Sequence, residues 1–258
     1  MDLSPAELRL QCRQGKFNFP TPGIASGFLQ ANLVILPKNM AFDFLVFCSR
    51  NPQPCPLLDI TEVGNPEPSI VATAADLRTD LPRYHIFRNG EFQEEVADIT
   101  DIWRDDFVGF LVGCSFSFEA ALMDAGIRVR HIEEGKNVPM YKTNIPCKAA
   151  GKFSGPLVVS MRPLSPSDLI RAVQITSNFP KAHGKPVHFG FPEEIGITNL
   201  GAPDFGEAVT VCEGEIPVFW ACGVTTQIAI LQAKPEIAIT HAPGHMFVTD
   251  VKEDFFSW

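Results

Sequence analysis

The sequence lacks several features that would assign it to common functional classes. No apolar run in its 258 residues approaches the length of about 18 needed for a membrane-spanning helix. The formal net charge is -9 and no cluster of Lys and Arg is present, so neither a nucleic acid nor a membrane surface is expected as a partner. A GxGxxG turn, typical of dinucleotide-binding folds, is also missing.

Targeting signals and disulfide patterns are missing as well. The first residues, MDLSPAELRL, begin acidic and then favour a helix, so we expect no signal peptide and a cytoplasmic protein. The seven cysteines show no CxxC spacing, and their odd number argues against a disulfide framework. No low-complexity linker divides the chain. We therefore treat residues 1–258 as one unit, with a smaller α/β subdomain inserted at about 80–160 as a further hypothesis.

Capping and turn signals predict several elements. Ser4 to Glu7 has the form of a capping box with Pro5 at the first helical position, and the helix can end at Gly15. Apolar composition predicts a helix over 39–51, and a second cap at Ser165 opens one over 165–179. Asn89 and Gly90 predict a hairpin within 83–96.

The second half alternates short apolar runs with helical patterns. Helices are expected after Cys114 and Cys222. Strands are expected at residues 128–134, 155–162, 185–191, 215–222 and 236–242. This alternation is typical of an α/β fold, with mixed sheets flanked by helices and two subdomains.

Two segments look like variants of one strand-to-helix junction. They are FLVGCSFSFEAALMDAGI (110–127) and VFWACGVTTQIAILQA (218–233). Each passes from apolar residues through a cysteine and hydroxyl residues into a helix, whose free N-H groups suit a carboxylate. Hydroxyl groups are expected to cap these helices. The alternative is that the hydroxyls only cap and the cysteines only pack. The candidate substrate-binding residues here are Cys114, Ser115, Ser117, Gly223, Thr225 and Thr226, with Cys222 as a catalytic candidate.

The stretch ITHAPGHMFVTD (239–250) places two of the six histidines around a predicted turn. Pro243 and Gly244 fit the central positions of a type II turn, so His241 and His245 could face one cavity. Imidazole can act as base or acid near neutral pH, which makes both histidines candidate proton carriers. A purely structural pair is the alternative. A metal pair is less consistent with the sequence, because Pro243 and Gly244 oppose the helix that HxxxH ligation uses.

Other polar residues extend the candidate site. Glu119 follows the first junction and could act as a base, or could only complement the helix dipole. Arg162 ends an apolar run where a parallel strand would deliver it to a ligand, so it could clamp a carboxylate or form a surface ion pair. The segment NVPMYKTNIPC offers Tyr141, Thr143 and Asn144 as substrate-binding candidates, of which alternation lets only some face one pocket.

Long stretches of the chain resemble the hydro-lyase family that is similar to D-glutamate cyclase. The resemblance lies in FCSRNPQPCPLLDITEVG, WRDDFVGFLVGCSFSFEAALMDAGIRVRHIEEGKNVPMYKTNIPC, GPLVVSMRPLSPSDLIRAVQITSNFP, FWACGVTTQ and ITHAPGHMFVTD. It implies an α/β fold of two subdomains and a carbon-oxygen lyase of amino-acid metabolism. The implied reaction converts D-glutamate to 5-oxo-D-proline and water, or dehydrates a related small carboxylate, without nicotinamide, flavin or pyridoxal phosphate. A homo-oligomer is compatible with it.

Two other functions fit the same residues. Cys114 and Cys222 could be the two thiols of a cofactor-independent racemase or epimerase, one removing an α-proton and the other returning it. A non-catalytic domain that binds carboxylates at the helix N-termini is the second alternative. Both alternatives place a small carboxylate or amino acid near the two junctions.

Overall fold

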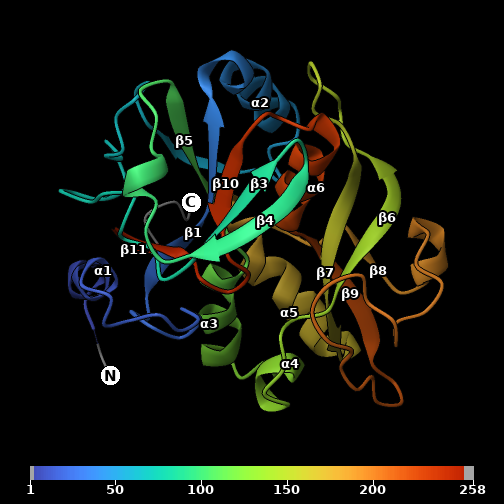
Figure 1. The fold of residues 1–258 in the computed structure, drawn as a ribbon. Coiled ribbons are helices and arrows are strands. Elements are labelled where there is room, and N and C mark those ends of the chain that lie inside the picture. Colours follow the sequence, from blue (N-terminus) through green and yellow to red (C-terminus); the bar gives the residue numbers. More distant parts are fainter. Residues whose placement is uncertain (1–2, 253–258) are drawn as a thin grey trace.

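Two antiparallel β-sheets share the chain in the computed structural model, which describes residues 3–252 (Figure 1). The larger sheet has the strand order β2-β5-β1-β10-β3-β4, and β11 also pairs with β1. Its strands are β1 (Phe28–Pro37), β2 (Leu57–Ile60), β3 (Tyr84–Arg88), β4 (Glu91–Val96), β5 (Phe107–Gly113), β10 (Ala238–His241) and β11 (Phe247–Lys252). The smaller sheet has the order β6-β7-β9-β8. Its strands are β6 (Met140–Pro146), β7 (Pro156–Leu164), β8 (His188–Phe189) and β9 (Ile216–Ala221).

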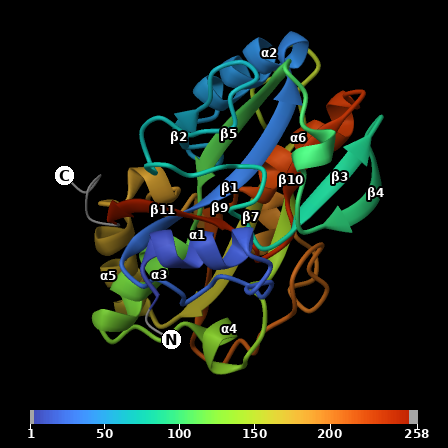
Figure 2. The same ribbon diagram turned by 60° about the vertical axis from the view of Figure 1, so that its left-hand side comes forward.

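The helices fill the space between the two sheets and cover their ends. They are α1 (Pro5–Arg13), α2 (Lys38–Arg50), α3 (Phe116–Asp124), α4 (Arg130–Glu133), α5 (Pro166–Thr176) and α6 (Val224–Ala233), with 3₁₀ turns at Thr100–Ile102, Pro180–Ala182 and Pro192–Ile195. Helix α6 lies between the sheets: Ile230 packs with the larger sheet and Ile228 with the smaller one (Figure 1). Helices α3 and α4 lie beside each other at the lower end of the molecule (Figure 2).

Local sequence signals determine several of these elements as expected. Ser4 and Glu7 form the complete capping box of α1, and Ser165 accepts the N-H of Asp168 at the start of α5. Asn89 and Gly90, with φ of 51° and 81°, form the β3–β4 turn. The combination of helices with sheets confirms the α/β class, and helices follow Cys114 and Cys222 as predicted.

Two of the predicted strands are wrong in part or in whole. Within residues 128–134, Arg130–Glu133 form α4, because Val129 and Ile132 are three residues apart and fit a helical turn, closed by the Ile132 N-H to the Val129 carbonyl at 3.0 Å. The strand predicted over 185–191 shrinks to β8. Pro186 offers no N-H to a ladder, and Gly190 has a φ of 67°, which ends the extended backbone.

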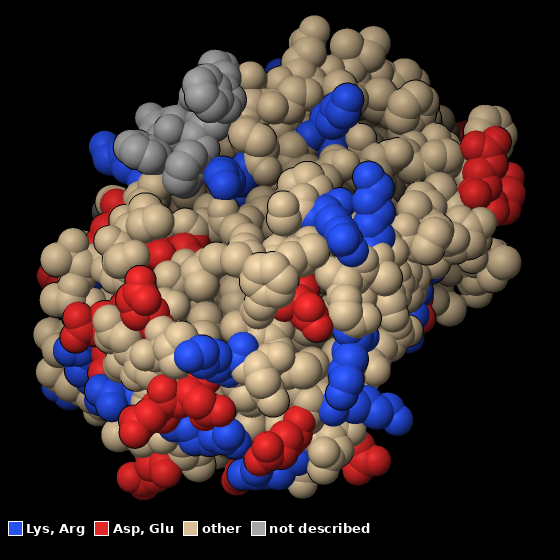
Figure 3. All heavy atoms as spheres, turned by 90° about the horizontal axis from the view of Figure 1, so that it is seen from above, with Lys and Arg blue, Asp and Glu red and all other residues tan. Residues whose placement is uncertain are grey.

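Charge is distributed without segregation on the face seen from above. Red and blue side chains are interspersed on this face (Figure 3). None of the helices within residues 3–252 combines the length and apolarity that crossing a membrane would require.

Candidate functional site

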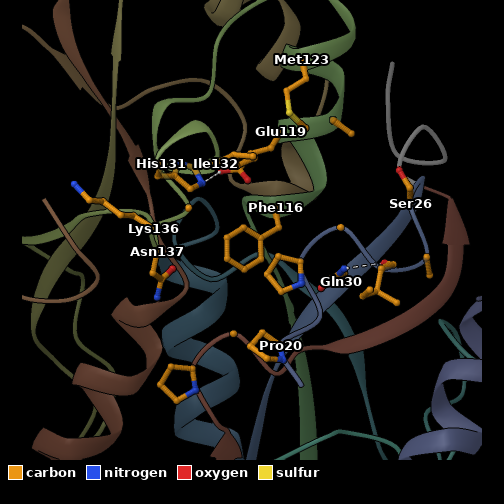
Figure 4. A pocket seen from close by; sticks show the side chains of 18 of the residues that line it. Pro20, Ser26, Gln30, Phe116, Glu119, Met123, His131, Ile132, Lys136 and Asn137 are labelled. Carbon is orange, nitrogen blue, oxygen red and sulfur yellow. Dashed lines mark hydrogen bonds and ion pairs between the residues drawn. The ribbon is translucent and has the colours of Figure 1, made fainter. Parts of the chain in front are cut away.

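A cavity of about 540 Å³ lies between the loop over 20–27, the start of β1, one face of α3, the α4 segment and the turn at Pro243 (Figure 4). Cavities of this size hold small-molecule ligands. The residues that line it are Pro20, Pro22, Gly23, Ile24, Ala25, Ser26, Phe28, Gln30, Phe116, Glu119, Ala120, Met123, His131, Ile132, Gly135, Lys136, Asn137, Pro243 and Gly244.

Helix α3 presents one continuous face to this cavity. Phe116, Glu119, Ala120 and Met123 line it, at the i, i+3, i+4, i+7 spacing that places side chains on one side of a helix. The opposite side of α3 packs Phe118 and Leu122 into the core. One wall of the cavity is therefore a helix that is fixed by packing on its other side.

Gln30 holds the loop that forms the opposite wall. Its Oε1 accepts the Thr21 hydroxyl at 2.8 Å, and its Nε2 donates to the Thr21 and Ile24 carbonyls at 3.0 and 3.3 Å. The Thr21 N-H in turn donates to the Gly244 carbonyl at 2.8 Å. The loop over 20–27 is thus joined to β1 by the buried Gln30 side chain and to the turn at Gly244 by a backbone hydrogen bond.

Three ionisable side chains meet at the α3 wall. Glu119 Oε1 accepts hydrogen bonds from Arg162 Nε at 3.0 Å and from Arg162 Nη2, and lies 3.2 Å from His131 Nε2. All three are buried, and Arg162 is only 1% exposed. Glu119 and His131 line the cavity, whereas Arg162 stands behind them. A buried charge pair of this kind needs all its partners, because an unpaired buried ion is strongly destabilising.

The Arg162 guanidinium is fully occupied by its surroundings. Nη1 donates to the Ser160 hydroxyl at 3.0 Å and Nη2 lies 3.5 Å from the Ser115 hydroxyl. The centroids of the Phe118 and Trp220 rings lie 5.0 and 5.4 Å from its central carbon.

The parallel strand expected to carry Arg162 is wrong: β7, which carries this residue, is antiparallel to β6 and β9. Arg162 reaches the site from the middle of the sheet because its side chain points from β7 toward α3.

Burial raises the pKa of Glu119, but the positive charge of Arg162 and the hydrogen bonds from His131 and Arg162 outweigh it, so the net pKa is lowered. Glu119 therefore stays ionised at neutral pH. An ionised carboxylate with a lowered pKa is a weak base, and this arrangement makes it an anchor for the imidazole of His131.

His131 is the site residue that the sequence did not single out. With Nε2 directed at Glu119, its Nδ1 is buried and has no hydrogen-bond partner within residues 3–252. Buried polar atoms are nearly always paired, so an unpaired nitrogen on a residue that lines the cavity makes His131 a candidate for contact with a ligand. The only sequence signal was the presence of one histidine in a segment expected to be a strand.

The turn over 242–245 reaches the same cavity through Pro243 and Gly244, whereas neither His241 nor His245 is among the lining residues. The His245 N-H donates to the Ala242 carbonyl at 2.9 Å and Gly244 has a φ of 77°, which confirms the type II turn. Pro243 and Gly244 line the cavity.

His241 is buried, and its Nδ1 accepts the Leu33 N-H at 3.2 Å. Burial lowers the pKa of His241 to about 4. His245 is half-buried, with Nδ1 2.9 Å from the Pro243 carbonyl.

Comparison with known proteins assigns the chain to a family. The family model described as D-glutamate cyclase matches residues 108–250, which include both strand-to-helix junctions and the turn at Pro243. The chain belongs to the D-glutamate cyclase family. A protein named "Putative hydro-lyase" from Stutzerimonas stutzeri is 60% identical over 253 residues, covering 98% of this chain and 96% of the relative. One named "Putative hydro-lyase YcsI" from Bacillus subtilis is 58% identical over 252 residues, covering 98% of both.

In this D-glutamate cyclase family member, the two junction cysteines are buried thiols. Burial raises the pKa of Cys114 to about 12 and that of Cys222 to about 11, although a backbone N-H, from Phe116 or Val224, lowers each in part. The two sulfurs lie close enough for the charge of one to affect the pKa of the other. Both thiols therefore remain protonated at neutral pH. A protonated thiol is a poor nucleophile and a poor base, because only the thiolate is reactive.

The predicted hydroxyl caps at these junctions are wrong. Neither α3 nor α6 has a side-chain cap hydrogen bond. Ser115 has helical backbone angles rather than the extended ones that capping requires, and it faces Arg162 instead. Ser117 accepts the Gln30 N-H at 3.4 Å, Thr225 accepts the Val158 N-H at 3.0 Å, and Thr226 donates to the Gly223 carbonyl at 2.7 Å.

The N-H groups of both helix starts are largely used within the chain. Ser117 and Phe118 donate to the Cys114 and Ser115 carbonyls. At α6, the N-H groups of Thr225 and Thr226 donate to the Cys222 and Gly223 carbonyls in the same manner. These bonds compete with any carboxylate expected at the helix N-termini.

The three candidates on β6 lie on the smaller sheet, outside the cavity lining. The Tyr141 hydroxyl donates to the Leu200 carbonyl at 2.7 Å, and burial raises its pKa to about 12. Thr143 donates to the Leu157 carbonyl at 2.8 Å, and exposed Asn144 lies 3.4 Å from the Glu194 carbonyl. Within residues 3–252, no group of three or more His, Cys, Asp or Glu side chains is arranged to hold a metal ion.

Proposed function

We propose that the cavity beside α3 catalyses the cyclising dehydration of D-glutamate to 5-oxo-D-proline, with His131 as the proton carrier. Two observations support this proposal. The chain belongs to the D-glutamate cyclase family, and its relatives carry the hydro-lyase name. The cavity wall also holds an imidazole with one nitrogen anchored and the other unpaired.

The reaction needs a base first and an acid afterwards. His131 Nδ1 takes a proton from the α-ammonium, and the free amine attacks the γ-carboxyl carbon, so that the N-C bond closes the ring. The imidazolium delivers this proton to one oxygen of the attacked carboxyl group, and His131 then takes the second proton from the ring nitrogen and delivers it to the same oxygen. The C-O bond breaks and that oxygen leaves as water. Holding amine and carboxyl together in one cavity supplies much of the rate gain.

Glu119 and Arg162 are positioning residues in this scheme. Glu119 accepts from His131 Nε2, which selects the tautomer with its lone pair on Nδ1 and stabilises the imidazolium that forms. Arg162 keeps Glu119 ionised and fixed from behind. The observation that carries the proposal is that His131, which lines the cavity, has Nε2 against Glu119 and a buried Nδ1 without a partner among the described residues.

The test compares two histidine variants in an assay that follows D-glutamate and a product lighter by one water. In His131→Gln, the side-chain amide can still donate to Glu119 but cannot act as a base. We expect kcat/KM to fall by about 10² to 10⁴, the usual contribution of a positioned proton carrier. In His245→Asn, the amide can keep the contact to the Pro243 carbonyl, and activity should stay within about threefold.

The reverse pattern would reject this assignment. If His245→Asn lost 100-fold or more while His131→Gln stayed active, the proton carrier would be the His245 that the turn sequence suggests. Denaturant unfolding of both variants at pH 7 separates lost chemistry from lost folding.

A further inference from the structure

Polar side chains line part of the cavity, and they differ in whether the protein already uses them. Besides Glu119 and His131, the polar lining residues are Ser26, Gln30, Lys136 and Asn137. The Gln30 amide is occupied by its hydrogen bonds to the loop over 20–27. The Lys136 ammonium donates to the Glu134 carboxylate and to the Ala208 carbonyl, both at 2.8 Å. Both of these side chains therefore have partners within the chain.

The side chains of Ser26 and Asn137 make no hydrogen bond within residues 3–252. Figure 4 shows them in different parts of the cavity: Ser26 lies across from His131, whereas Asn137 lies on the same side as His131. A few polar groups of this kind fix the orientation of a ligand in a cavity. Asn137 is therefore the available polar group on the side of the base that the proposed function uses.

The end of α4 fixes the position of Asn137 relative to His131. Gly135 has a φ of 65°, the left-handed conformation that often ends a helix. The Gly135 N-H donates to the Ile132 carbonyl at 3.1 Å, and the Lys136 N-H donates to the His131 carbonyl at 2.8 Å. These two bonds form a Schellman motif. Because the second bond folds residue 136 back onto His131, Asn137 begins beside the turn that carries the imidazole.

The backbone of Asn137 is also held from the side of Glu207. The Asn137 N-H donates to the Glu207 carboxylate at 3.2 Å, and the Glu207 N-H donates to the Asn137 carbonyl at 3.2 Å. The next residue, Val138, is buried. A side chain on a backbone that is already ordered loses less entropy when it binds a ligand. The Asn137 amide is thus held in place by its backbone but has no partner of its own.

We infer that the Asn137 side-chain N-H binds the α-carboxylate of the substrate and makes the cavity specific for amines that carry this carboxylate. This inference rests on the proposed cyclisation at His131. The amine and the α-carboxylate are attached to the same carbon, so a group that holds the carboxylate beside His131 also places the amine next to Nδ1. A hydrogen bond to an ionised carboxylate is about twice as strong as one between neutral groups. The γ-carboxyl group remains free to fold back toward the amine.

The experiment measures turnover of D-glutamate and, by calorimetry, the binding of two lactams. The product 5-oxo-D-proline keeps the α-carboxylate, whereas 2-pyrrolidinone is the same ring without it. We expect the original protein to bind 5-oxo-D-proline at least about tenfold more tightly than 2-pyrrolidinone.

The variant Asn137→Leu keeps the size of the side chain but removes its hydrogen-bond donor. The KM for D-glutamate and the Kd of 5-oxo-D-proline should each rise about tenfold to 100-fold, the usual effect of losing a hydrogen bond to a charged group. The kcat should stay within about threefold, because the carboxylate is bound equally in the ground state and the transition state. The Kd of 2-pyrrolidinone should change less than about twofold. Because Asn137 is exposed, the substitution should not affect folding.

Asn178→Leu is the matched control, since Asn178 is also exposed but lies outside the cavity lining, and it should leave all these constants unchanged. If the original protein binds the two lactams equally, or if Asn137→Leu leaves the KM and the Kd of 5-oxo-D-proline unchanged, the inference is overturned and the cyclase proposal stands. If the original protein releases no water from D-glutamate, the proposed function fails and the inference fails with it.

Discussion

The β5–α3 and β9–α6 junctions share a local design but occupy different surroundings. In each, a buried strand ends at a cysteine whose sulfur faces the N-H two residues later, from Phe116 or Val224. The fifth residue after each cysteine is Glu119 in one junction and Gln227 in the other. Helix α6 is enclosed between the two sheets, while α3 presents one face to the cavity.

This comparison shows that the junction itself does not create a site. Both cysteines have raised pKa values and both helix starts satisfy most of their own N-H groups. Only the α3 junction places a carboxylate where Arg162 and His131 converge. The two junctions differ in the side chains that surround each helix. Substitutions that make the surroundings of one junction like those of the other test whether these side chains create the site.

The largest effect should come from making the first junction like the second. Glu119→Gln leaves the Arg162 guanidinium buried without a carboxylate, and we expect the free energy of unfolding to fall by about 3–5 kcal/mol. Urea unfolding at pH 7 measures this. Because the pKa of Glu119 is lowered in the folded protein, its contribution to the free energy of unfolding is complete above pH 4.5 and is lost as the pH falls below that value. The difference in unfolding free energy between the original protein and Glu119→Gln should therefore narrow at low pH.

Glu236→Gln is the matched control for this substitution. Glu236 lies 3.2 Å from Arg104 but is 72% exposed at its side chain, so its loss should cost less than about 1 kcal/mol. Equal costs for the two glutamates would show that the cluster around Arg162 is not energetically distinct from a surface pair.

An intermediate effect is expected at alkaline pH. The folded-state pKa values of Cys114, about 12, and Cys222, about 11, lie above the ordinary thiol value of 9.0. Stability from each thiol is therefore full below pH 9 and is lost as the pH rises toward the folded value, at about 1.4 kcal/mol per pH unit.

Unfolding free energies between pH 9 and 11 test this expectation. In Cys114→Ala and in Cys222→Ala, the unfolding free energy should decline less steeply with pH, by the amount that corresponds to about one proton, or about 1.4 kcal/mol per pH unit. Substitution of the exposed Ser177 by Ala should leave the slope unchanged. An unaltered slope in both cysteine variants would mean that these thiols ionise as readily in the folded protein as in the unfolded chain.

The smallest effect should be on turnover when each thiol becomes a hydroxyl. Cys114→Ser and Cys222→Ser keep an acceptor for the facing N-H, so we expect kcat/KM to fall less than about tenfold, or about 1.4 kcal/mol. In heavy water the α-carbon should keep its hydrogen, because amine attack does not touch it. Rapid α-deuteration of recovered D-glutamate, lost in either serine variant, would instead favour the two-thiol racemase.

Signals that act over a few residues predicted structure well. The capping box at Ser4, the cap at Ser165 and the turns at Asn89 and Pro243 all form as expected, because each depends on neighbours within four residues. The strand expected over 128–134 is wrong because β-branched residues and helical spacing give opposing signals in so short a segment, and Arg130–Glu133 form a helical turn.

The sequence by itself determined the family, the capped starts of α1 and α5, the type II turn and the choice of Glu119 as a candidate. The tertiary structure alone decided the partners of that carboxylate. Glu119 and Arg162 are 43 residues apart and meet because the long Arg162 side chain reaches from β7 to α3, while His131 arrives on α4. Turns and caps follow from local backbone angles, whereas buried ion clusters depend on how distant elements pack, which no short stretch of sequence encodes.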